Sequence, residues 1–311
     1  MERKILVTGG AGFIGSSMAK RLADDPDNYV VIVDNLLTGS LNKIPTSAYR
    51  NVKFIKADAN DFNEISSIFH AYSFDYVFHY AAVVGVKRTV ANPVLVLRDL
   101  DGLENVLNLS KNTGVKRIYF SSSSEVYGEP VEFPQNEHTT PLNSRLPYAI
   151  VKNVGEAYLR AYKQEYDLDY TIFRFFNTYG PKQSPDFVMS KFIMAAQDNQ
   201  DITIYGDGTQ TRTFCYIDDN LDACLNAFYN NKIVNDVANI GSAHEITILD
   251  LAKLILKLTN SASKIVHVPP LEEGDMTRRK PDVAKMRYLL NREPLNIEDG
   301  IAKVLSAPQF V

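Results

Sequence analysis

A tyrosine and a lysine stand four residues apart at positions 148 and 152, in a segment with the periodicity of a helix. At that spacing the side chains of Tyr148 and Lys152 share one helix face. The spacing alone carries little weight, because Tyr49 and Lys53 repeat it in a loop region. Position distinguishes the first pair, since it follows, by about one loop, a serine-rich strand end at residues 121–128. Parallel sheets bind their ligands outside such strand ends.

These side chains could oxidise a sugar hydroxyl if a nicotinamide were bound beside them. The ammonium of Lys152, together with the positive nicotinamide, would lower the pKa of the Tyr148 phenol. The phenolate could then remove the hydroxyl proton while a hydride leaves the same carbon. We expect Ser123 to hydrogen-bond the hydroxyl that Tyr148 deprotonates.

A glycine-rich loop lies near the N-terminus, between a predicted strand and a predicted helix. Residues 9–15 read Gly-Gly-Ala-Gly-Phe-Ile-Gly and satisfy both the G-x-G-x-x-G and the G-x-x-G-x-x-G spacing. The missing side chains allow a tight turn and let a pyrophosphate approach the backbone amides at the positive end of the helix. The residues predicted to bind a dinucleotide here are Gly9, Gly12, Phe13, Ile14 and Gly15.

An acid at the end of the second predicted strand indicates which dinucleotide is bound. Asp34 follows Gly15 by about 20 residues, and its carboxylate can accept both ribose hydroxyls of NAD and would repel the 2′-phosphate of NADP. The predicted cofactor is therefore NAD. For Asp58, a contact with the adenine and a simple loop cap both agree with the sequence. The other residues predicted to contact the cofactor are Asn35, Ala59, Ala81, Ala82, Tyr148 and Lys152.

The elements that must position these residues alternate between strands and helices over the first 180 residues. Runs rich in Val, Ile, Tyr and Phe predict buried strands at 4–8, 29–34, 52–56, 76–80, 117–121 and 170–175. Helical patterns occupy 14–24, 62–71, 94–113 and 148–166. This alternation predicts an α/β fold with a Rossmann-like, doubly wound parallel sheet covered by helices on both faces.

The pattern loosens after residue 180. Helices are predicted at 186–199, 218–229 and 248–258, and a strand at 202–205. Because no flexible linker separates the halves, we expect a second domain that is interleaved with the first. The predicted domains are an NAD-binding domain at 1–180, with parts of 210–240 returning to it, and a second domain at 181–311.

The composition excludes several classes of partner. A net charge of −4 and a pI of about 5.8 argue against nucleic acid, whose phosphates demand a basic face. No stretch reaches the ~18 unbroken apolar residues of a membrane span, and no signal-peptide core precedes the first strand, so we expect a cytoplasmic protein without membrane contact. Cys215 and Cys224 are too few for a disulfide framework. The five histidines show no metal-ligand spacing, so no metal site is predicted.

With further motifs, these features resemble the extended short-chain dehydrogenases/reductases, in particular the NAD-dependent nucleotide-sugar epimerases and dehydratases. The further motifs are Val-Tyr-Gly at 126–128, Asn-Thr-Tyr-Gly-Pro at 177–181 and Tyr-Gly-Asp-Gly-Thr-Gln-Thr-Arg at 205–212. The resemblance implies a nucleoside diphosphate sugar as substrate, bound by a smaller, interleaved C-terminal α/β substrate domain at 181–311. It also implies tightly held NAD that is reduced and reoxidised within one turnover. It implies that Asn177 and Arg212 bind phosphate and that Tyr205 stacks on the base. The predicted substrate-binding set is completed by Lys191, Arg278 and Arg279.

Ser124 and Glu125, which we expect to form a second acid–base set, reduce the number of candidate reactions within the family. Simple 4-epimerases usually carry a small or hydroxylated residue where Glu125 stands, so the glutamate resembles the lyases of the family. Sugar 4,6-dehydratases typically carry Asp-Glu, and Ser124 lacks the acid for the departing 6-hydroxyl. Ser-Glu resembles both UDP-glucuronate decarboxylases and GDP-mannose 4,6-dehydratases. The stretches 134–137 and 145–148 fit the second, whereas 210–216 and 278–282 fit the first better.

The predicted activity is therefore oxidation of C4 of a nucleoside diphosphate hexose or hexuronate. Decarboxylation of UDP-glucuronate is preferred, because a 4-keto uronate is a β-keto acid and loses CO₂ readily; Arg278 or Arg279 could supply the cation for a carboxylate or phosphate. Dehydration at C4 and C6 comes second and 4-epimerisation third. The alternative from another class is a non-catalytic NAD-sensing scaffold, against which the intact Tyr148 and Lys152 argue.

The helical segments 94–113 and 148–166 carry apolar residues on more than one face. Such helices are expected to be buried on two sides. One side is expected to pack on the sheet and the other on the same helices of a second subunit, which predicts a homodimer.

Overall fold

Strands and helices alternate along the first half of the chain, in the order that the sequence predicts. The strands are β1 (Arg3–Thr8), β2 (Asn28–Asp34), β3 (Val52–Lys56), β4 (Tyr76–His79), β5 (Arg117–Ser123), β6 (Asp169–Phe175), β7 (Thr178–Tyr179), β8 (Ile202–Tyr205), β9 (Thr211–Thr213), β10 (Cys215–Tyr216), β11 (Asp236–Ile240), β12 (Glu245–Thr247) and β13 (Ile265–Val268). The helices are α1 (Phe13–Ala23), α2 (Phe62–Tyr72), α3 (Val86–Ala91), α4 (Pro93–Leu97), α5 (Asp99–Thr113), α6 (Pro147–Tyr166), α7 (Val188–Gln197), α8 (Ile217–Tyr229), α9 (Ile248–Thr259), α10 (Ala284–Leu290) and α11 (Ile297–Ser306). Short 3₁₀ turns span Leu41–Lys43 and Ser124–Tyr127.

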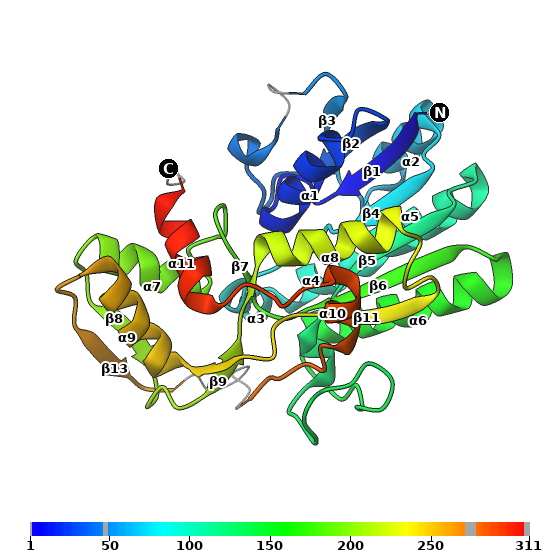
Figure 1. Ribbon diagram of the computed structural model, residues 1–311. Helices are drawn as coiled ribbons and strands as arrows, with labels where there is room; N and C mark the ends of the chain where they lie inside the picture. Colours follow the sequence, from blue (N-terminus) through cyan, green and yellow to red (C-terminus); the bar gives the residue numbers. More distant parts are fainter. Residues whose placement is uncertain (1, 46–48, 271–277, 308–311) are drawn as a thin grey trace. The chain divides into compact units, whose positions relative to one another are not determined.

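A seven-stranded sheet with the order β11-β6-β5-β4-β1-β2-β3 is the largest sheet of this computed structural model, which describes residues 2–45, 49–270 and 278–307 (Figure 1). The strands from β3 through β2, β1 and β4 to β5 pair in parallel. The strand order reverses at β1, which lies between β2 and β4. Doubly wound sheets bind their ligands at such a reversal. The predicted Rossmann-like α/β fold is confirmed.

Helices α2, α5 and α6 lie side by side against one face of the sheet (Figure 1). Apolar residues at helical spacing on α5, including Leu103 and Val106, join Leu159 of α6, Leu6 of β1 and Phe120 of β5 in one core. Burial of these side chains, at roughly 25 cal/mol per Å² of apolar surface, fixes which helix face meets the sheet. The face of α6 that meets the sheet is therefore set by its apolar residues.

Helix α1 and the last turns of α8 cover the opposite face (Figure 1). Phe228 of α8 packs edge-on against Phe78 of β4 and Tyr119 of β5, with ring centroids 5.7 and 5.6 Å apart. Both faces of these central strands are thus buried, which explains their nearly continuous apolar sequence.

The prediction of one helix over 94–113 is wrong, because two helices occupy this stretch. Helix α4 ends at Leu97 and α5 begins at Asp99, with Arg98 between them at φ −65° and ψ −18°. The backbone angles of Arg98 stay near helical values, and neither Gly nor Pro occurs at the interruption. The two acids Asp99 and Asp101 in the first turn of α5 are the sequence signal for a new helix start.

The chain divides into two compact units. Unit 1 comprises Met1–Val126, Arg145–Arg174 and Leu225–Ala238; unit 2 comprises Tyr127–Ser144, Phe175–Cys224 and Asn239–Val311. Within unit 2, β7 pairs with β10 and β8 with β13 in parallel, while β9 and β12 are antiparallel. Helix α9 contacts both α7 and α11.

A close contact fixes the position of α11 in unit 2. Tyr179 is 1% exposed, and a Cβ added to Gly300 would lie 1.8 Å from its hydroxyl oxygen. Position 300 therefore accepts no side chain unless Tyr179 moves. A search of the described helices finds none long and apolar enough to cross a membrane.

Candidate active site

The glycine loop joins β1 to α1, with backbone packed directly against backbone. Gly9 has a φ of +67°, and a Cβ there would lie 2.6 Å from the amide nitrogen of Ala81. A Cβ on Gly15 would lie 2.3 Å from the carbonyl oxygen of Gly9, which accepts the N–H of Gly12 at 3.0 Å. Both positions therefore require glycine. No side chain caps the N-terminus of α1, and such uncapped N–H groups suit the predicted pyrophosphate.

Asp34 ends β2 with its carboxylate held in a fixed orientation. The side chain is 9% exposed; Oδ2 accepts the backbone N–H of Ala11 at 2.9 Å, and Oδ1 accepts that of Leu36 at 2.8 Å. Each carboxylate oxygen has a second lone pair. Asp34 can therefore accept two ribose hydroxyls without losing its backbone contacts. Together with the glycine cradle, this geometry fits NAD.

The remaining predicted cofactor residues follow β2, β3 and β4. Asn35 Nδ2 donates to Asp58 Oδ2 at 3.0 Å, so the structure brings these two together. Asp58 Oδ1 also accepts the N–H of Asn60 at 2.9 Å, which is the loop-cap role that the sequence left open. Ala59 is buried, and Ala81 with Ala82 is half-buried directly after β4.

Tyr148 and Lys152 lie in the first turns of α6 and face the end of β5. Lys152 is 3% exposed, and its Nζ donates to Ser121 Oγ at 3.5 Å. The same nitrogen lies 5.8 Å from the centroid of the Tyr148 ring and 4.9 Å from that of Phe120. The structure thus places the predicted tyrosine–lysine pair beside the predicted serine-rich strand end.

The surroundings of Lys152 shift the pKa values of two groups. Burial lowers the pKa of Lys152 to about 8, and the charge of Asp99 opposes that lowering. His79 is 3% exposed, and its Nδ1 lies 2.9 Å from Thr8 Oγ1. Burial, and then the charge of Lys152, lower the pKa of His79 to about 3. At neutral pH this arrangement holds a neutral imidazole and a largely protonated ammonium, and the ammonium can stabilise a phenolate at Tyr148.

The predicted second acid–base set follows at the carboxyl end of β5. Ser123 is 9% exposed and its Oγ accepts the N–H of Glu125 at 3.2 Å, so its own proton remains available to an acceptor. Ser124 is buried at 1% exposure, whereas Glu125 is half-buried. Glu125 is therefore the more accessible member of this pair.

A buried ion pair lies one turn beyond Lys152 on α6. Arg174 of β6 donates from Nε and Nη2 to the two carboxylate oxygens of Glu156, at 2.8 and 2.7 Å. Ser122 of β5 adds a hydrogen bond to Glu156 Oε1 at 2.7 Å. The side chains of Arg174 and Glu156 are 2% and 0% exposed. These contacts attach α6 to β5 and β6 at a fixed height along the strands.

In unit 2, three of the predicted substrate residues converge around β9. Asn177 has a φ of +37°, and its Nδ2 donates to the carbonyl of Thr213 at 2.9 Å. Arg212, the preceding residue of β9, is 8% exposed. Thr211 forms an isolated parallel bridge with Arg278. Residues far apart in sequence are thus brought to one strand.

Two more predicted substrate residues meet at the junction of α7 and β8. Lys191 Nζ lies 5.3 Å from the centroid of the Tyr205 ring. This is a cation–π distance. A charged group and an aromatic face are therefore presented together, as a phosphorylated nucleoside would require.

The two arginines at 278 and 279 differ in their surroundings. Arg278 donates to both carboxylate oxygens of Glu245, at 2.5 and 2.8 Å, and Lys280 lies 3.0 Å from the same carboxylate. Hydrogen bonds from Arg278 lower the pKa of Glu245 to about 2. Arg279 is 7% exposed. The charge of Arg278 is thus compensated within unit 2, which weakens it as a ligand for an added anion.

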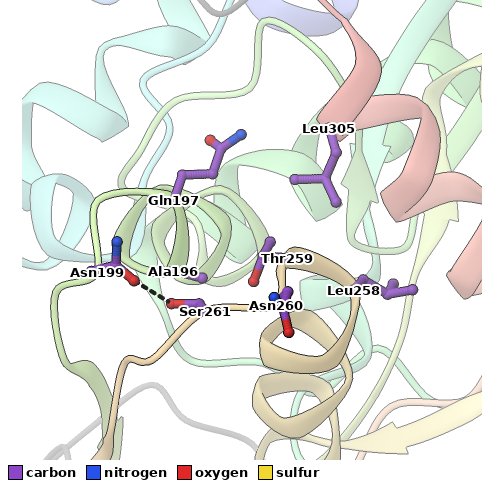
Figure 2. Close-up of a pocket in the computed structure, with 8 residues that line it drawn as sticks. All are labelled: Ala196, Gln197, Asn199, Leu258, Thr259, Asn260, Ser261 and Leu305. Carbon is purple, nitrogen blue, oxygen red and sulfur yellow. Dashed lines mark hydrogen bonds between the residues drawn. The ribbon is translucent and has the colours of Figure 1, made fainter.

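A pocket with a volume of about 520 Å³ also lies in unit 2, where α7, α9 and α11 end (Figure 2). Its lining includes Gln197, Asn199, Asn260, Ser261 and Leu305. Asn199 Oδ1 accepts the Ser261 hydroxyl at 3.3 Å across this rim (Figure 2). None of the residues predicted to act in the site lines this pocket.

Five residues near the tyrosine–lysine pair were not predicted from the sequence. Three of them contact Lys152 or interact with it electrostatically, and two form the buried ion pair one turn further along α6: His79, Asp99, Ser121, Glu156 and Arg174. One signal was available, because Glu156 repeats the four-residue spacing of Tyr148 and Lys152. Arg174 gave a second signal, since a charged residue inside a buried strand needs a buried partner.

Comparison with known proteins identifies the family of the chain. The model of the NAD dependent epimerase/dehydratase family matches residues 5–241. The chain is 36% identical to UDP-N-acetyl-α-D-glucosaminuronate decarboxylase of Bacillus cytotoxicus, over 98% of this chain and 97% of the relative. It is 33% identical to UDP-glucuronic acid decarboxylase 1 of Danio rerio, over 98% of this chain and 72% of that one.

A solved structure agrees over the same length. The UDP-glucose 4-epimerase of Thermotoga maritima, solved with UDP-glucose, superimposes with a TM-score of 0.91 at 34% identity, and the match covers 97% of each chain. The sequence motifs, the sheet and these relatives lead to one conclusion: the chain belongs to the NAD-dependent epimerase/dehydratase family.

Proposed function

We propose that this chain is an NAD-dependent decarboxylase of UDP-glucuronate. The observation that supports oxidation at C4 is the buried Lys152 ammonium, 5.8 Å from the ring of Tyr148 at the end of β5. Support for decarboxylation comes from Glu125 after Ser124 and from the activities of the two named decarboxylases. We assign the cofactor role to unit 1 and the nucleotide-sugar role to unit 2.

In this proposal the residues of unit 1 carry out the oxidation. NAD, when bound, supplies the acceptor for the hydride of C4 and later returns it. The glycine loop and Asp34 hold the cofactor's pyrophosphate and ribose. Tyr148 takes the proton of the 4-hydroxyl, Ser123 donates a hydrogen bond to the same oxygen, and Lys152 stabilises the phenolate.

The ketone at C4 makes the uronate a β-keto acid. The C5–C6 bond then breaks, CO₂ leaves, and the electron pair passes into the enolate of the 4-ketone. C5 must receive a proton before the ketone is reduced again. We assign this proton to Glu125, because it is the accessible carboxyl group of the β5 end, with Ser124 beside it.

The residues of unit 2 are assigned to the rest of the substrate. Arg212 and Asn177 hold the pyrophosphate, since a guanidinium binds phosphate bidentately. Tyr205 stacks on the base and Lys191 compensates nearby phosphate charge. Arg279 is preferred to Arg278 as the cation for the uronate, because Glu245 already binds Arg278.

A 4-epimerase is the second candidate: the agreement with the Thermotoga enzyme moves it ahead of the 4,6-dehydratase, which the sequence alone ranked second. A 4,6-dehydratase ranks third, because Ser124 provides no acid for the 6-hydroxyl. The protein is incubated with a panel of sugar nucleotides, and the products are separated and analysed by mass spectrometry. This distinguishes the three reactions, because two of them lower the mass by different amounts and the third leaves it unchanged. Loss of about 44 mass units from UDP-glucuronate supports decarboxylation, loss of about 18 from a hexose indicates dehydration, and an isomer of equal mass indicates epimerisation.

The mutant Glu125→Gln sharpens this ranking. A decarboxylase should still release CO₂, because the β-keto acid breaks down without a base, but it should protonate C5 poorly. A dehydratase should accumulate NADH and a 4-keto sugar, with water loss slowed by ~10²–10⁴-fold. An epimerase should change mainly in substrate affinity. Release of CO₂ that stops entirely would contradict the proposed role of Glu125.

We also propose that the protein is a homodimer. Large apolar side chains remain exposed on α3, α4 and α6: Val90, Val94, Leu97 and Ile150 are 51%, 67%, 43% and 40% exposed. Helix α4 contacts both α3 and α6, and exposed apolar side chains on neighbouring helices are typical of a subunit contact. Light scattering should report twice the chain mass of 34.9 kDa at micromolar concentration. A monomer there would refute the proposal, and Val94→Lys should convert the dimer to monomers.

A further inference from the structure

Lys152 is a cation buried in an environment that offers it few hydrogen bonds. The residue is 3% exposed; its ammonium donates a 3.5 Å hydrogen bond to Ser121 and lies near the rings of Phe120 and Tyr148. Hydroxyl and aromatic groups compensate a buried charge only in part. A protonated lysine at this place needs a negative charge nearby.

Asp99 borders the apolar cluster that contains Tyr148, and its charge acts on Lys152. It is the first residue of α5, directly after the interruption at Arg98, and its Oδ2 accepts the backbone N–H of Val83 at 2.8 Å. Val83 packs in one apolar cluster with Val151, the neighbour of Lys152, and with Tyr148. The start of α5 is therefore joined through Val83 to the face of α6 that carries the tyrosine–lysine pair.

We propose that Asp99 is a positioning residue of the active site, whose carboxylate provides the counter-charge for Lys152 and so keeps that lysine protonated beside Tyr148. This inference rests on the proposed role of Lys152 in oxidation. Asp99 does not touch the reacting atoms.

The other groups around Lys152 do not replace this charge. His79 of β4 is neutral near pH 7, because burial lowers its pKa to about 3. Ser121 of β5 is uncharged, and Glu156 on the next turn of α6 is already bound by Arg174. Burial raises the pKa of Asp99, and the charge of Asp58, after β3, adds to the rise. The N–H of Val83, the charge of Lys152 and a hydrogen bond from Asn60 oppose it.

The direct test is the titration of Lys152 in the protein without substrate. Lysine labelled with ¹³C at Cε is followed by NMR from pH 6 to 11, and the Lys152 signal is identified by its loss in Lys152→Arg. In Asp99→Asn its midpoint should move about one pH unit lower, the shift expected from losing one nearby buried charge. Asp101→Asn, an exposed residue of the same helix turn, removes the same formal charge and should leave the midpoint in place.

Reciprocity provides a second measurement that does not depend on the folding of Asp99→Asn. If the two charges interact, Lys152→Gln must raise the pKa of Asp99 by about as much as Asp99→Asn lowers that of Lys152. Asp99→Glu, which keeps the charge, should titrate like the unchanged protein. A Lys152 midpoint that stays within a few tenths of a pH unit in Asp99→Asn, or an Asp99 midpoint unmoved in Lys152→Gln, would overturn the inference.

The pH dependence of turnover separates this inference from the proposed function. With the substrate found in the panel, the alkaline limb of kcat should shift to lower pH by about one unit in Asp99→Asn and stay unchanged in Asp101→Asn. If the maximal kcat of Asp99→Asn falls while the alkaline limb of its pH profile stays in place, Asp99 has only a structural role and the inference is refuted. Normal turnover by Tyr148→Phe would refute the proposed function instead, whatever Lys152 titrates at.

Discussion

The two units build their functional residues in different ways. In unit 1 the predicted site residues stand at the ends of neighbouring parallel strands or on α6 beside them, and several are buried and bound by backbone or by other buried groups, as Asp34 and Lys152 are. In unit 2 they come from short strands and loops, and their partners lie far away in sequence, as with Arg278 and Glu245. Sheet topology places the first set, whereas individual side-chain contacts place the second. Substitutions of the catalytic residues proposed in unit 1 should therefore lower kcat, whereas substitutions in unit 2 should raise KM.

The largest effect is expected from Tyr148→Phe. Phenylalanine keeps the ring that packs with Val83 and Val151 but has no proton to exchange, so turnover should fall by ~10²–10⁴-fold. The melting temperature should stay nearly the same. Single-turnover absorbance of NADH measures the loss, and Tyr166→Phe, at an exposed position of the same helix, is the matched control. A KM effect without a kcat effect would contradict the assignment of chemistry to unit 1.

Arg212→Ala tests the corresponding statement for unit 2. Removing a buried guanidinium from a phosphate should raise KM by roughly 10- to 100-fold, since a hydrogen bond to a charged group contributes about 1.5–3 kcal/mol. Arg278→Ala should change KM less than threefold or so, because Glu245 compensates its charge and exposed pairs contribute little. Initial rates give KM, and calorimetry with NAD should show unchanged cofactor binding in both variants. The reverse order of the two arginines would contradict the assignment.

Gly300→Ala tests packing in unit 2 without touching the proposed chemistry. The new Cβ would overlap the hydroxyl of Tyr179, and overpacking of this kind costs about 1–3 kcal/mol. Within the described residues that hydroxyl has no hydrogen-bond partner, so Tyr179→Phe should be nearly neutral. The double variant should recover part of the stability, since the new Cβ would still lie 2.8 Å from Cζ of the ring. Urea denaturation measures each, and equal losses in the single and double variants would show that the hydroxyl is not the cause.

A modest effect is expected for Asp34→Ala. The loss of hydrogen bonds to a ribose should weaken NAD binding by about tenfold. NADP should gain relative to NAD, because the repulsion disappears and Lys43, which interacts electrostatically with Asp34, remains. Fluorescence titration with both cofactors measures the ratio. A protein that binds NADP as tightly as NAD before any substitution would show that Asp34 does not select the cofactor.

The strand–helix alternation and the glycine loop could be predicted because each is a local pattern. Strand β11 was not predicted: Asp236–Ile240 is short, and its place beyond β6 at the sheet edge is set by tertiary packing. Asp99 escaped prediction because the apolar run through 94–113 suggested an unbroken helix. The convergence of Thr211 with Arg278 depends on chain crossings that no local pattern contains. The roles assigned to the site residues remain predictions.

The buried pair of Glu156 and Arg174 restricts how this protein can evolve. Replacing either residue alone leaves an uncompensated charge in the core and costs about 3–5 kcal/mol, a large part of the stability of an ordinary domain. Drift through single substitutions is therefore blocked, and the two positions must change together or not at all. Chimaeras that exchange α6 between relatives should fold only when the residues at 122 and 174 are exchanged with it.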